Sequence, residues 1–156
     1  MNKSVRQLIL EHIQSLFAAV IAGQNGFDFA FSVVEIGPLS DPDQRKLNAV
    51  GIVAGKERKK FLFPYEECFL PVALEFRVTQ NRGDAKPGVL AETMLTAVQM
   101  MMYRNRTMGG LSLDAKETSN EIDLTTYVDK SIVGVSFWDI QYRHAHADPT
   151  NPLPTV

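Results

Sequence analysis

Cysteine and histidine are scarce in this chain, and their scarcity limits its chemistry. Cys68 is the only cysteine among the 156 residues, so an internal disulfide is impossible and the chain suits a reducing compartment. It lies in the apolar stretch CFLPVALEF, and no catalytic histidine motif accompanies it. We therefore interpret Cys68 as a buried thiol and not as a nucleophile.

A long hydrophobic run is also absent. No segment approaches the roughly 18 apolar residues of a membrane-spanning helix. The N-terminal stretch MNKSVRQLILEHIQSLF lacks the apolar region and the cleavage site of a signal peptide. The net charge of −2 argues against a dedicated nucleic-acid binder. We expect a soluble protein that is made in the cytoplasm and has no membrane partner.

The common catalytic motifs are missing as well. The sequence contains no phosphate-binding glycine loop, dinucleotide fingerprint, H-E-x-x-H or G-x-S-x-G motif. The acidic residues between Asp114 and Asp123 show no pattern of burial that would raise a carboxyl pKa for acid–base catalysis. From these absences we expect no enzyme activity and no cofactor.

Hydrophobic periodicity predicts two helices and several strands. Apolar residues from Val5 to Val20 recur at helical spacing, and Ser4 with Gln7 fits a capping box, which predicts a helix over 5–21. A second helix is predicted over about 87–104. Strands are predicted at 29–37, 48–55, 59–67, 68–80, 111–124 and 131–144.

Two predicted strands contain irregular features. Pro71 cannot donate a ladder hydrogen bond, so the strand over 68–80 is expected to begin at an exposed edge or a bulge. In the strand over 131–144, the apolar positions change parity between Phe137 and Trp138. This change predicts either a bulge or a strand that is covered on both faces, once by the domain and once by a partner.

The order of elements favours an α+β fold, with a mainly antiparallel β-sheet and two helices packed on one face. We expect a single domain over residues 1–146, because the sequence shows no repeat and no long linker. The last ten residues, ADPTNPLPTV, contain three prolines. They predict an extended C-terminal arm over 147–156.

The stretch HAHAD near the C-terminus raises the hypothesis of a metal site. On a strand, His144, His146 and Asp148 would point to the same side, so a metal-dependent hydrolase is one candidate function. Two observations argue against a metal site. The only other histidine is His12, in the first predicted helix, and Pro149 directly follows Asp148 near the C-terminus, where a rigid set of metal ligands is hard to build. We favour a solvated strand end that contacts a neighbouring subunit.

A basic stretch, GKERKK, joins two predicted strands at 55–60. Its cations are Lys56, Arg58, Lys59 and Lys60, and it has no interleaved aromatic residues for base stacking. We interpret it as a solvated hairpin that can serve as an interface loop, with charge matched to an acidic protein surface.

The region from about 86 to 150 resembles the tail terminator (tail completion, or tail-to-head joining) proteins of long-tailed bacteriophages. The resemblance lies in the order of a helix, a turn like RTMGGLSLDAKETSNEIDL, a short link like TTYVDKS, and a last strand of the form GVSFWDIQYRHAHADP. Its most distinctive part is Tyr142-Arg143-His144, with Asp148-Pro149 soon after. His146 departs from the pattern.

The resemblance implies a structural virion protein of the tail neck, assembled in the host cytoplasm. Six copies would form a ring that caps the tail tube, ends its polymerisation and offers the head connector a joining surface, while DNA passes through the ring only as cargo. Another neck protein (connector, stopper or adaptor) and an oligomeric binding module unrelated to phages are the alternatives. The expected contacts with other subunits, tube or connector are Lys56, Arg58, Lys59, Lys60, Tyr142, Arg143, His144, His146 and Asp148.

Overall fold

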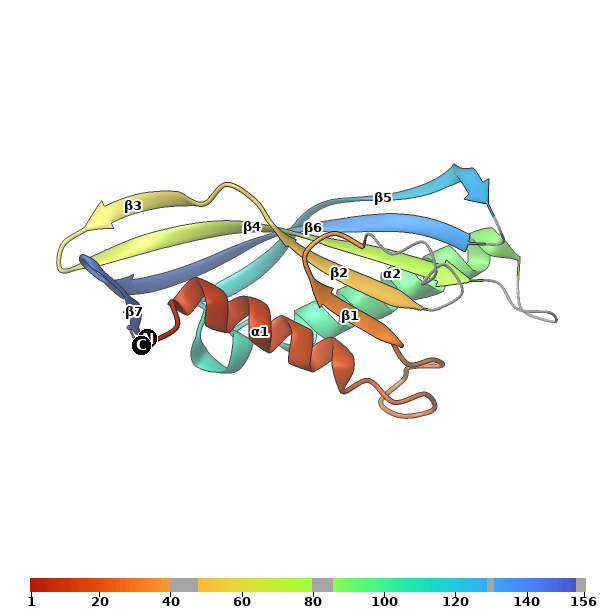
Figure 1. Ribbon diagram of the computed structural model, residues 1–156, viewed down its shortest axis with the longest axis horizontal. Coiled ribbons are helices and arrows are strands. Elements are labelled where there is room, and N and C mark those ends of the chain that lie inside the picture. Colours follow the sequence, from red (N-terminus) through yellow and green to blue (C-terminus); the bar gives the residue numbers. More distant parts are fainter. Residues whose placement is uncertain (40–47, 80–85, 129–130, 154–156) are drawn as a thin grey trace.

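The computed structural model describes residues 1–39, 48–79, 86–128 and 131–153, except for the side chains of 124–128. Both helices pack on one face of a curled, mainly antiparallel sheet (Figure 1), so the predicted α+β fold is confirmed. A short 3-10 helix at Met108–Gly110 follows the second helix. The main elements are α1 (Val5–Ala18), β1 (Val33–Ile36), β2 (Ala49–Ala54), β3 (Arg58–Leu62), β4 (Tyr65–Thr79), α2 (Pro87–Arg104), β5 (Asp114–Val128), β6 (Ser131–Ala145) and β7 (Asp148–Pro152).

Helix α1 forms as its sequence predicts, although it ends earlier. The Oγ atom of Ser4 accepts a hydrogen bond from the backbone N–H of Gln7 at 3.2 Å, which is one half of the predicted capping box. The side chain of Gln7 donates to Glu11 instead of returning to Ser4. The helix ends at Ala18 and not at residue 21. Its buried stripe consists of Val5, Ile9, Leu10, Ile13 and Phe17.

The sheet has the strand order β1-β2-β4-β6-β5, with β3 paired to β4 and β7 paired to β6. The β1–β2 pair is parallel, and the other pairs are antiparallel. Strands β4 and β6 contain 15 residues each and form the centre of the sheet. The apolar residues that alternate along the sequence of β4 form its inward face: Leu70, Val72, Leu74, Phe76 and Val78 are all buried in the core.

Pro71 does not lie at a sheet edge, but the bulge that was predicted as the alternative is present. Between the pairs Ala54–Val72 and Arg58–Phe69, residues 55–57 face only residues 70 and 71 of β4. Pro71 faces Asp139 of β6 on one side of β4, and on the other side its carbonyl accepts a hydrogen bond from Gly55 at 2.7 Å. Strand β2 ends at Ala54 and β3 begins at Arg58, so a break lies beside Pro71. The nitrogen and oxygen of one residue point to the same side of an antiparallel strand. The missing N–H therefore faces this break, where no ladder partner is required.

Strand β6 is regular where its sequence changes parity. It pairs with β4 at every position, so the bulge predicted for it is wrong, and the irregularity lies across the sheet between Glu117 and Ser119 of β5. Val133 and Phe137 are 42% and 40% exposed, on the face that α1 and α2 leave open. An apolar outer face thus explains the change of parity. The inward positions are Ile132, Gly134, Ser136, Trp138, Ile140, Tyr142 and His144.

The segment predicted as an extended arm turns back along the sheet. Strand β6 ends at Ala145, and the chain reverses at Ala147, which has a positive φ of 60°. Strand β7 then runs antiparallel to β6. Residues 148–152 are therefore extended, as predicted, and they also pair with the domain.

Candidate functional site

The β3–β4 hairpin projects from one end of the molecule, at the left of Figure 1. The C-terminal end of β6 lies beside this hairpin, because β4 pairs with β3 on one side and with β6 on the other. The basic stretch and the histidine-containing strand end, more than 80 residues apart in sequence, thus meet here. The Nζ atom of Lys59 lies 3.0 Å from Nε2 of His144.

On the inner face of this end, the ammonium group of Lys59 lies between two carboxylates. Glu66 Oε2 lies 3.2 Å from Lys59 Nζ and 3.5 Å from His144 Nε2. A second carboxylate, Glu57, lies 3.7 Å from the same ammonium group and accepts a hydrogen bond from the hydroxyl of Tyr142. His144 and Tyr142 are only 2% exposed. These contacts lock the hairpin onto β6 through charges that the subunit itself supplies.

The pKa shifts agree with this locking role. A hydrogen bond from Lys59 is the main cause that lowers the pKa of Glu66. Desolvation acts to lower the pKa of Lys59, but the hydrogen bond to Glu66 and the nearby negative charges outweigh it, so that pKa is raised. Burial raises the pKa of the Tyr142 hydroxyl and of the Cys68 thiol. Cys68 is buried, as predicted, and both of these groups are held in their protonated forms.

The outer face of the same end has a second network, centred on Glu67. This carboxylate is 7% exposed, and its Oε1 accepts hydrogen bonds from Nε2 of Gln141 at 2.9 Å and from Nε and Nη2 of Arg143 at 3.2 and 3.0 Å. Burial acts to raise the pKa of Glu67, and these hydrogen bonds outweigh it and lower the pKa. The guanidinium of Arg143 also lies 4.6 Å from the ring centroid of Tyr65.

The remaining cations of the basic stretch differ in their surroundings. Arg58 pairs with Asp139 at 2.9 Å and lies over the ring of Phe69. Lys56 and Lys60 are exposed. Next to Lys56 and Arg58, an apolar groove of about 560 Å³ opens on the outer face of the sheet. Its floor includes Val53, Pro71, Ala73 and Phe137.

The turn of the hairpin exposes aromatic rings that the sequence analysis did not single out. Phe61 is 60% exposed and Phe63 is 77% exposed. The ring of His146 lies 4.7 Å from the Phe61 centroid and 6.4 Å from that of Phe63. We call Phe61, Phe63 and His146 the aromatic tip. Its sequence signal is the alternation in KKFLFP, which places Phe61 and Phe63 on the same side of an edge strand before a turn proline.

Asp148 does not join the two histidines. Because β6 ends at Ala145, the aspartate lies beyond the turn, where its Oδ1 accepts hydrogen bonds from the N–H and the hydroxyl of Thr150 at 3.0 and 2.7 Å. These hydrogen bonds lower the pKa of Asp148. The expectation that His144, His146 and Asp148 share one side of a strand is therefore wrong. Within the described residues, no group of three His, Cys, Asp or Glu side chains has metal-binding geometry.

Comparisons with protein-family models and with curated proteins found no match to this chain. Among the described residues, no helix has both the length and the apolar character needed to cross a membrane.

Of the nine predicted interface residues, the networks at this end include Lys59, Tyr142, Arg143, His144 and His146. Lys56 and Arg58 border the outer groove, Lys60 lies exposed on β3, and Asp148 lies in β7. The carboxylates Glu57, Glu66 and Glu67 neutralise much of the basic charge, and no sequence pattern indicated their role. The result is a projecting β3–β4 hairpin that is held by ion pairs and carries exposed apolar rings at its tip.

Proposed function

We propose that this protein is a tail terminator of a long-tailed bacteriophage. Six copies form a ring that caps the tail tube, ends its polymerisation and provides the surface on which the head connector docks. The sequence resemblance over about 86–150 supports this choice of family. The observation that supports the proposal most directly is the projecting hairpin, whose tip exposes Phe61 and Phe63 beside rigid ion pairs.

The distribution of charge and apolar surface supports an assembly role. Lys59 and Arg143 form ion pairs with carboxylates of the same subunit, and these pairs hold the hairpin in one orientation. The exposed Val133 and Phe137 lie on the sheet face opposite the helices. Exposed apolar patches of this kind commonly mark surfaces that bind another protein.

In the proposed mechanism, one face of the ring mimics a layer of tube subunits and binds the last tube ring. The opposite face lacks the surface that the next tube subunit would need, so addition stops there. That face then binds the connector. In this mechanism no reaction is catalysed inside the ring, and the genome passes through it as cargo.

Electron microscopy of the purified protein tests the proposal first, and six-fold rings are the expected result. Tail assembly with purified tube protein tests the role: adding the protein should limit tube length, and the capped tubes should bind connector. A ring that binds connector but leaves tube length unchanged would favour a head-side stopper or adaptor. Monomers under all assembly conditions, with no effect on tubes, would refute both.

A variant series tests the part played by the hairpin. Replacing Lys56, Arg58, Lys59 and Lys60 by Ser should give abnormal tail length or tails that fail to join heads. Lys116→Ser is the control, since Lys116 is an exposed lysine on β5 that lies outside the basic stretch. Tails of normal length joined to heads would contradict the assignment of the hairpin.

A further inference from the structure

We propose that two copies of this chain pair through the outer faces of their sheets, about a two-fold axis that runs across the strands between the two copies. The outer face is the sheet face that α1 and α2 leave open, and the axis passes Ala73 and Phe137. The inference goes beyond the proposed function, because it concerns the free protein and not the ring on the tail tube.

The centre of the outer face is apolar. Two grooves open there, of about 560 and 380 Å³, and Ala73 and Phe137 line both of them. Phe137 and Val133 are 40% and 42% exposed. Leu39 packs over Gly51 of β2, so the open part of this face lies mainly on β4, β6 and β5. Such an apolar strip is a candidate surface for binding another protein.

The strand register places three rows of residues across this centre. The middle row joins Val53, Ala73, Phe137 and Ser119, on β2, β4, β6 and β5. Two residues further along β4, the acidic row contains Glu35, Glu75 and Glu121, on β1, β4 and β5. Two residues in the other direction, the third row contains Pro71, Asp139 and Lys116. Because side chains two positions apart share a face, all three rows lie on the outer face.

The charges of the outer face are separated between its two halves. In the half toward the hairpin, the cations are Lys56, Arg58, Lys60, Lys116 and Arg143. The carboxylates of that half are Glu67, Asp114 and Asp139.

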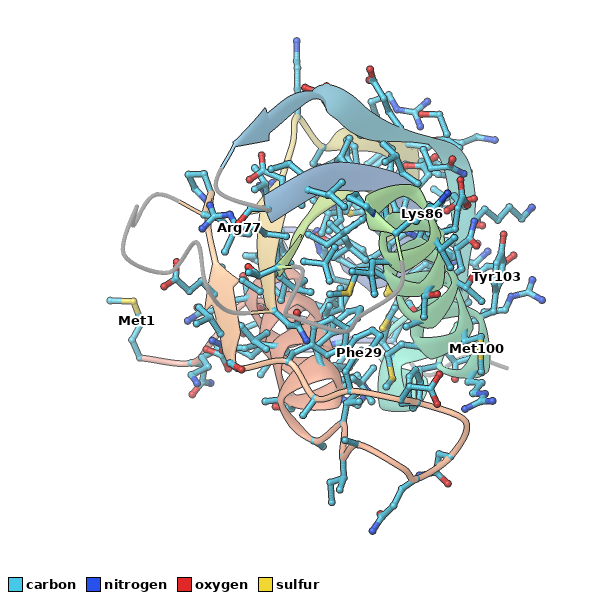
Figure 2. The ribbon with its side chains drawn as sticks, turned by 90° about the vertical axis from the view of Figure 1, so that its right-hand side faces the viewer. Met1, Phe29, Arg77, Lys86, Met100 and Tyr103 are labelled. Carbon is cyan, nitrogen blue, oxygen red and sulfur yellow. The ribbon has the colours of Figure 1, made fainter. Side chains whose placement is uncertain are left out.

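Beyond the middle row, the described carboxylates are Glu35, Glu75, Glu121 and Asp123. The described cation of this half is Arg77, which lies across the sheet from α2 in Figure 2. The segments 40–47, 80–85 and 129–130 each contain as many cations as carboxylates, so by sequence they add no net charge. One half of the outer face is therefore positive and the other half negative.

This separation favours a second copy as the partner. The axis runs across the strands, so each strand faces its own copy in the partner, with its direction reversed. The acidic row of one chain then lies over the row of Lys116 in the other. Glu121 and Lys116 are both on β5, so they face each other, and the symmetry forms this pair twice. The middle row packs on itself, as in the facing sheets of a β-sandwich.

The surroundings of Lys116 leave it available to a partner. Its side chain is 73% exposed, and its ammonium group lies 3.8 Å from Asp114. Asp114 forms a closer pair with Arg106, at 2.7 Å. Asp139, which is next to Lys116 across the β5–β6 ladder, is paired with Arg58 at 2.9 Å. The nearby carboxylates are thus already engaged by other cations.

Charge reversal tests the pairing by sedimentation equilibrium of the purified full chain, and the natural protein should form dimers. Glu121→Lys and Lys116→Glu should each raise the dissociation constant at least about tenfold, because each places like charges opposite each other. The double variant restores opposite charges and should return the dissociation constant to within about threefold of the natural value. Glu92→Lys is the matched control, since Glu92 is an exposed carboxylate on α2, outside this face.

A crosslink of one position to itself locates the axis. Facing sheets lie about 10 Å apart, which is wider than a disulfide spans, so a short bismaleimide is the reagent. Ala73→Cys should crosslink two copies, because Ala73 lies on the axis. Lys60→Cys should not, because Lys60 lies opposite Glu67, near the hairpin turn. The natural Cys68 is fully buried and should not react.

The outcomes separate this pair from the proposed function. Monomers at every concentration, dimers that the charge reversals do not weaken, or a crosslink at Lys60→Cys and none at Ala73→Cys would each overturn the two-fold pair. Six-fold rings in that case would leave the terminator proposal standing. Dimers that the double variant rescues, from a protein that never limits tube length, would support the pair and refute the terminator. Lys116→Ser should weaken the pair and leave tail length normal, because the pair belongs to the free protein.

Discussion

Replacing Arg143 by Met removes the guanidinium that holds Glu67 on the outer face of the hairpin end. The Met side chain keeps the apolar stem of the arginine, so the change isolates the polar contacts. Two hydrogen bonds are lost, from Nε at 3.2 Å and from Nη2 at 3.0 Å, together with the contact over the Tyr65 ring at 4.6 Å. Glu67 retains only the hydrogen bond from Gln141.

The expected loss of unfolding free energy follows from how deeply the two side chains are buried. The side chain of Glu67 is 9% exposed, whereas that of Arg143 is 34% exposed. A hydrogen bond to a charged group contributes about 1.5–3 kcal/mol, and the partial exposure of Arg143 places this pair near the lower end. A cation–π contact adds about 0.5–1 kcal/mol at such a site. We expect the free energy of unfolding to fall by about 2–3 kcal/mol.

Urea unfolding followed by circular dichroism measures this loss. With a denaturant slope of about 1–3 kcal/mol/M, the midpoint should fall by about 1 M. Arg58→Met is the matched control on the same face. Arg58 is 67% exposed, so its pair with Asp139 should contribute at most about 1 kcal/mol and its contact over the Phe69 ring about 0.5 kcal/mol. A double-mutant cycle with Glu67→Gln should give a coupling of at least about 1 kcal/mol.

Equal losses for Arg143→Met and Arg58→Met would refute this reasoning. So would an Arg143→Met variant that unfolds like the natural protein but no longer assembles. In that case Arg143 would act at the interface, as the sequence analysis first assumed, and not within the subunit.

The remaining predictions concern packing, protonation and metal. Gly134→Ala should cost about 1–3 kcal/mol in thermal unfolding, since its Cβ would lie 2.3 Å from Cζ of Phe76, whereas Gly88→Ala in α2 has open space and should be neutral or stabilising. The pKa of Glu67 is lower in the folded protein than in the unfolded chain, so the unfolded chain takes up a proton first as the pH falls. The stability that this carboxylate contributes should therefore be present above about pH 4.3 and be lost as the pH falls through the folded pKa. Glu67→Gln should flatten this part of the plot of unfolding free energy against pH. Metal analysis should find no stoichiometric zinc or manganese, and a metal that is lost on His146→Ala would revive the hydrolase hypothesis.

The helices and the central strands could be predicted because their patterns are local. The stripe from Val5 to Phe17 and the alternation from Leu70 to Val78 each specify one buried face without reference to the rest of the chain. The bulge beside Pro71 was one of the two predicted alternatives, but the sequence could not choose between them, since the missing N–H says only that no partner is bonded there. A break between two neighbouring strands satisfies that requirement as well as an edge does.

The histidine stretch illustrates the limit of spacing arguments at a strand end. His144 and His146 both contact Glu66, but Asp148 lies beyond the turn and accepts hydrogen bonds from Thr150, because the strand ends at Ala145. The alternation of a strand continues only as far as the turn that ends it. Here the chain turns at Ala147, whose φ is positive, and alanine is not a residue type from which a positive φ would be predicted.

By itself, the sequence determined the α+β class, the two helices, the inward face of β4 and the burial of Cys68, because hydrophobic periodicity acts over neighbouring residues. Only the tertiary structure decided that the basic stretch and the C-terminal strand meet, with Lys59 beside His144. It also decided which charges are neutralised by Glu57, Glu66 and Glu67 and which apolar rings stay exposed at Phe61 and Phe63. These features depend on strand order and register, and the pairing of β4 with β6, which joins residues as far apart as Tyr65 and Ala145, is not encoded in any local pattern.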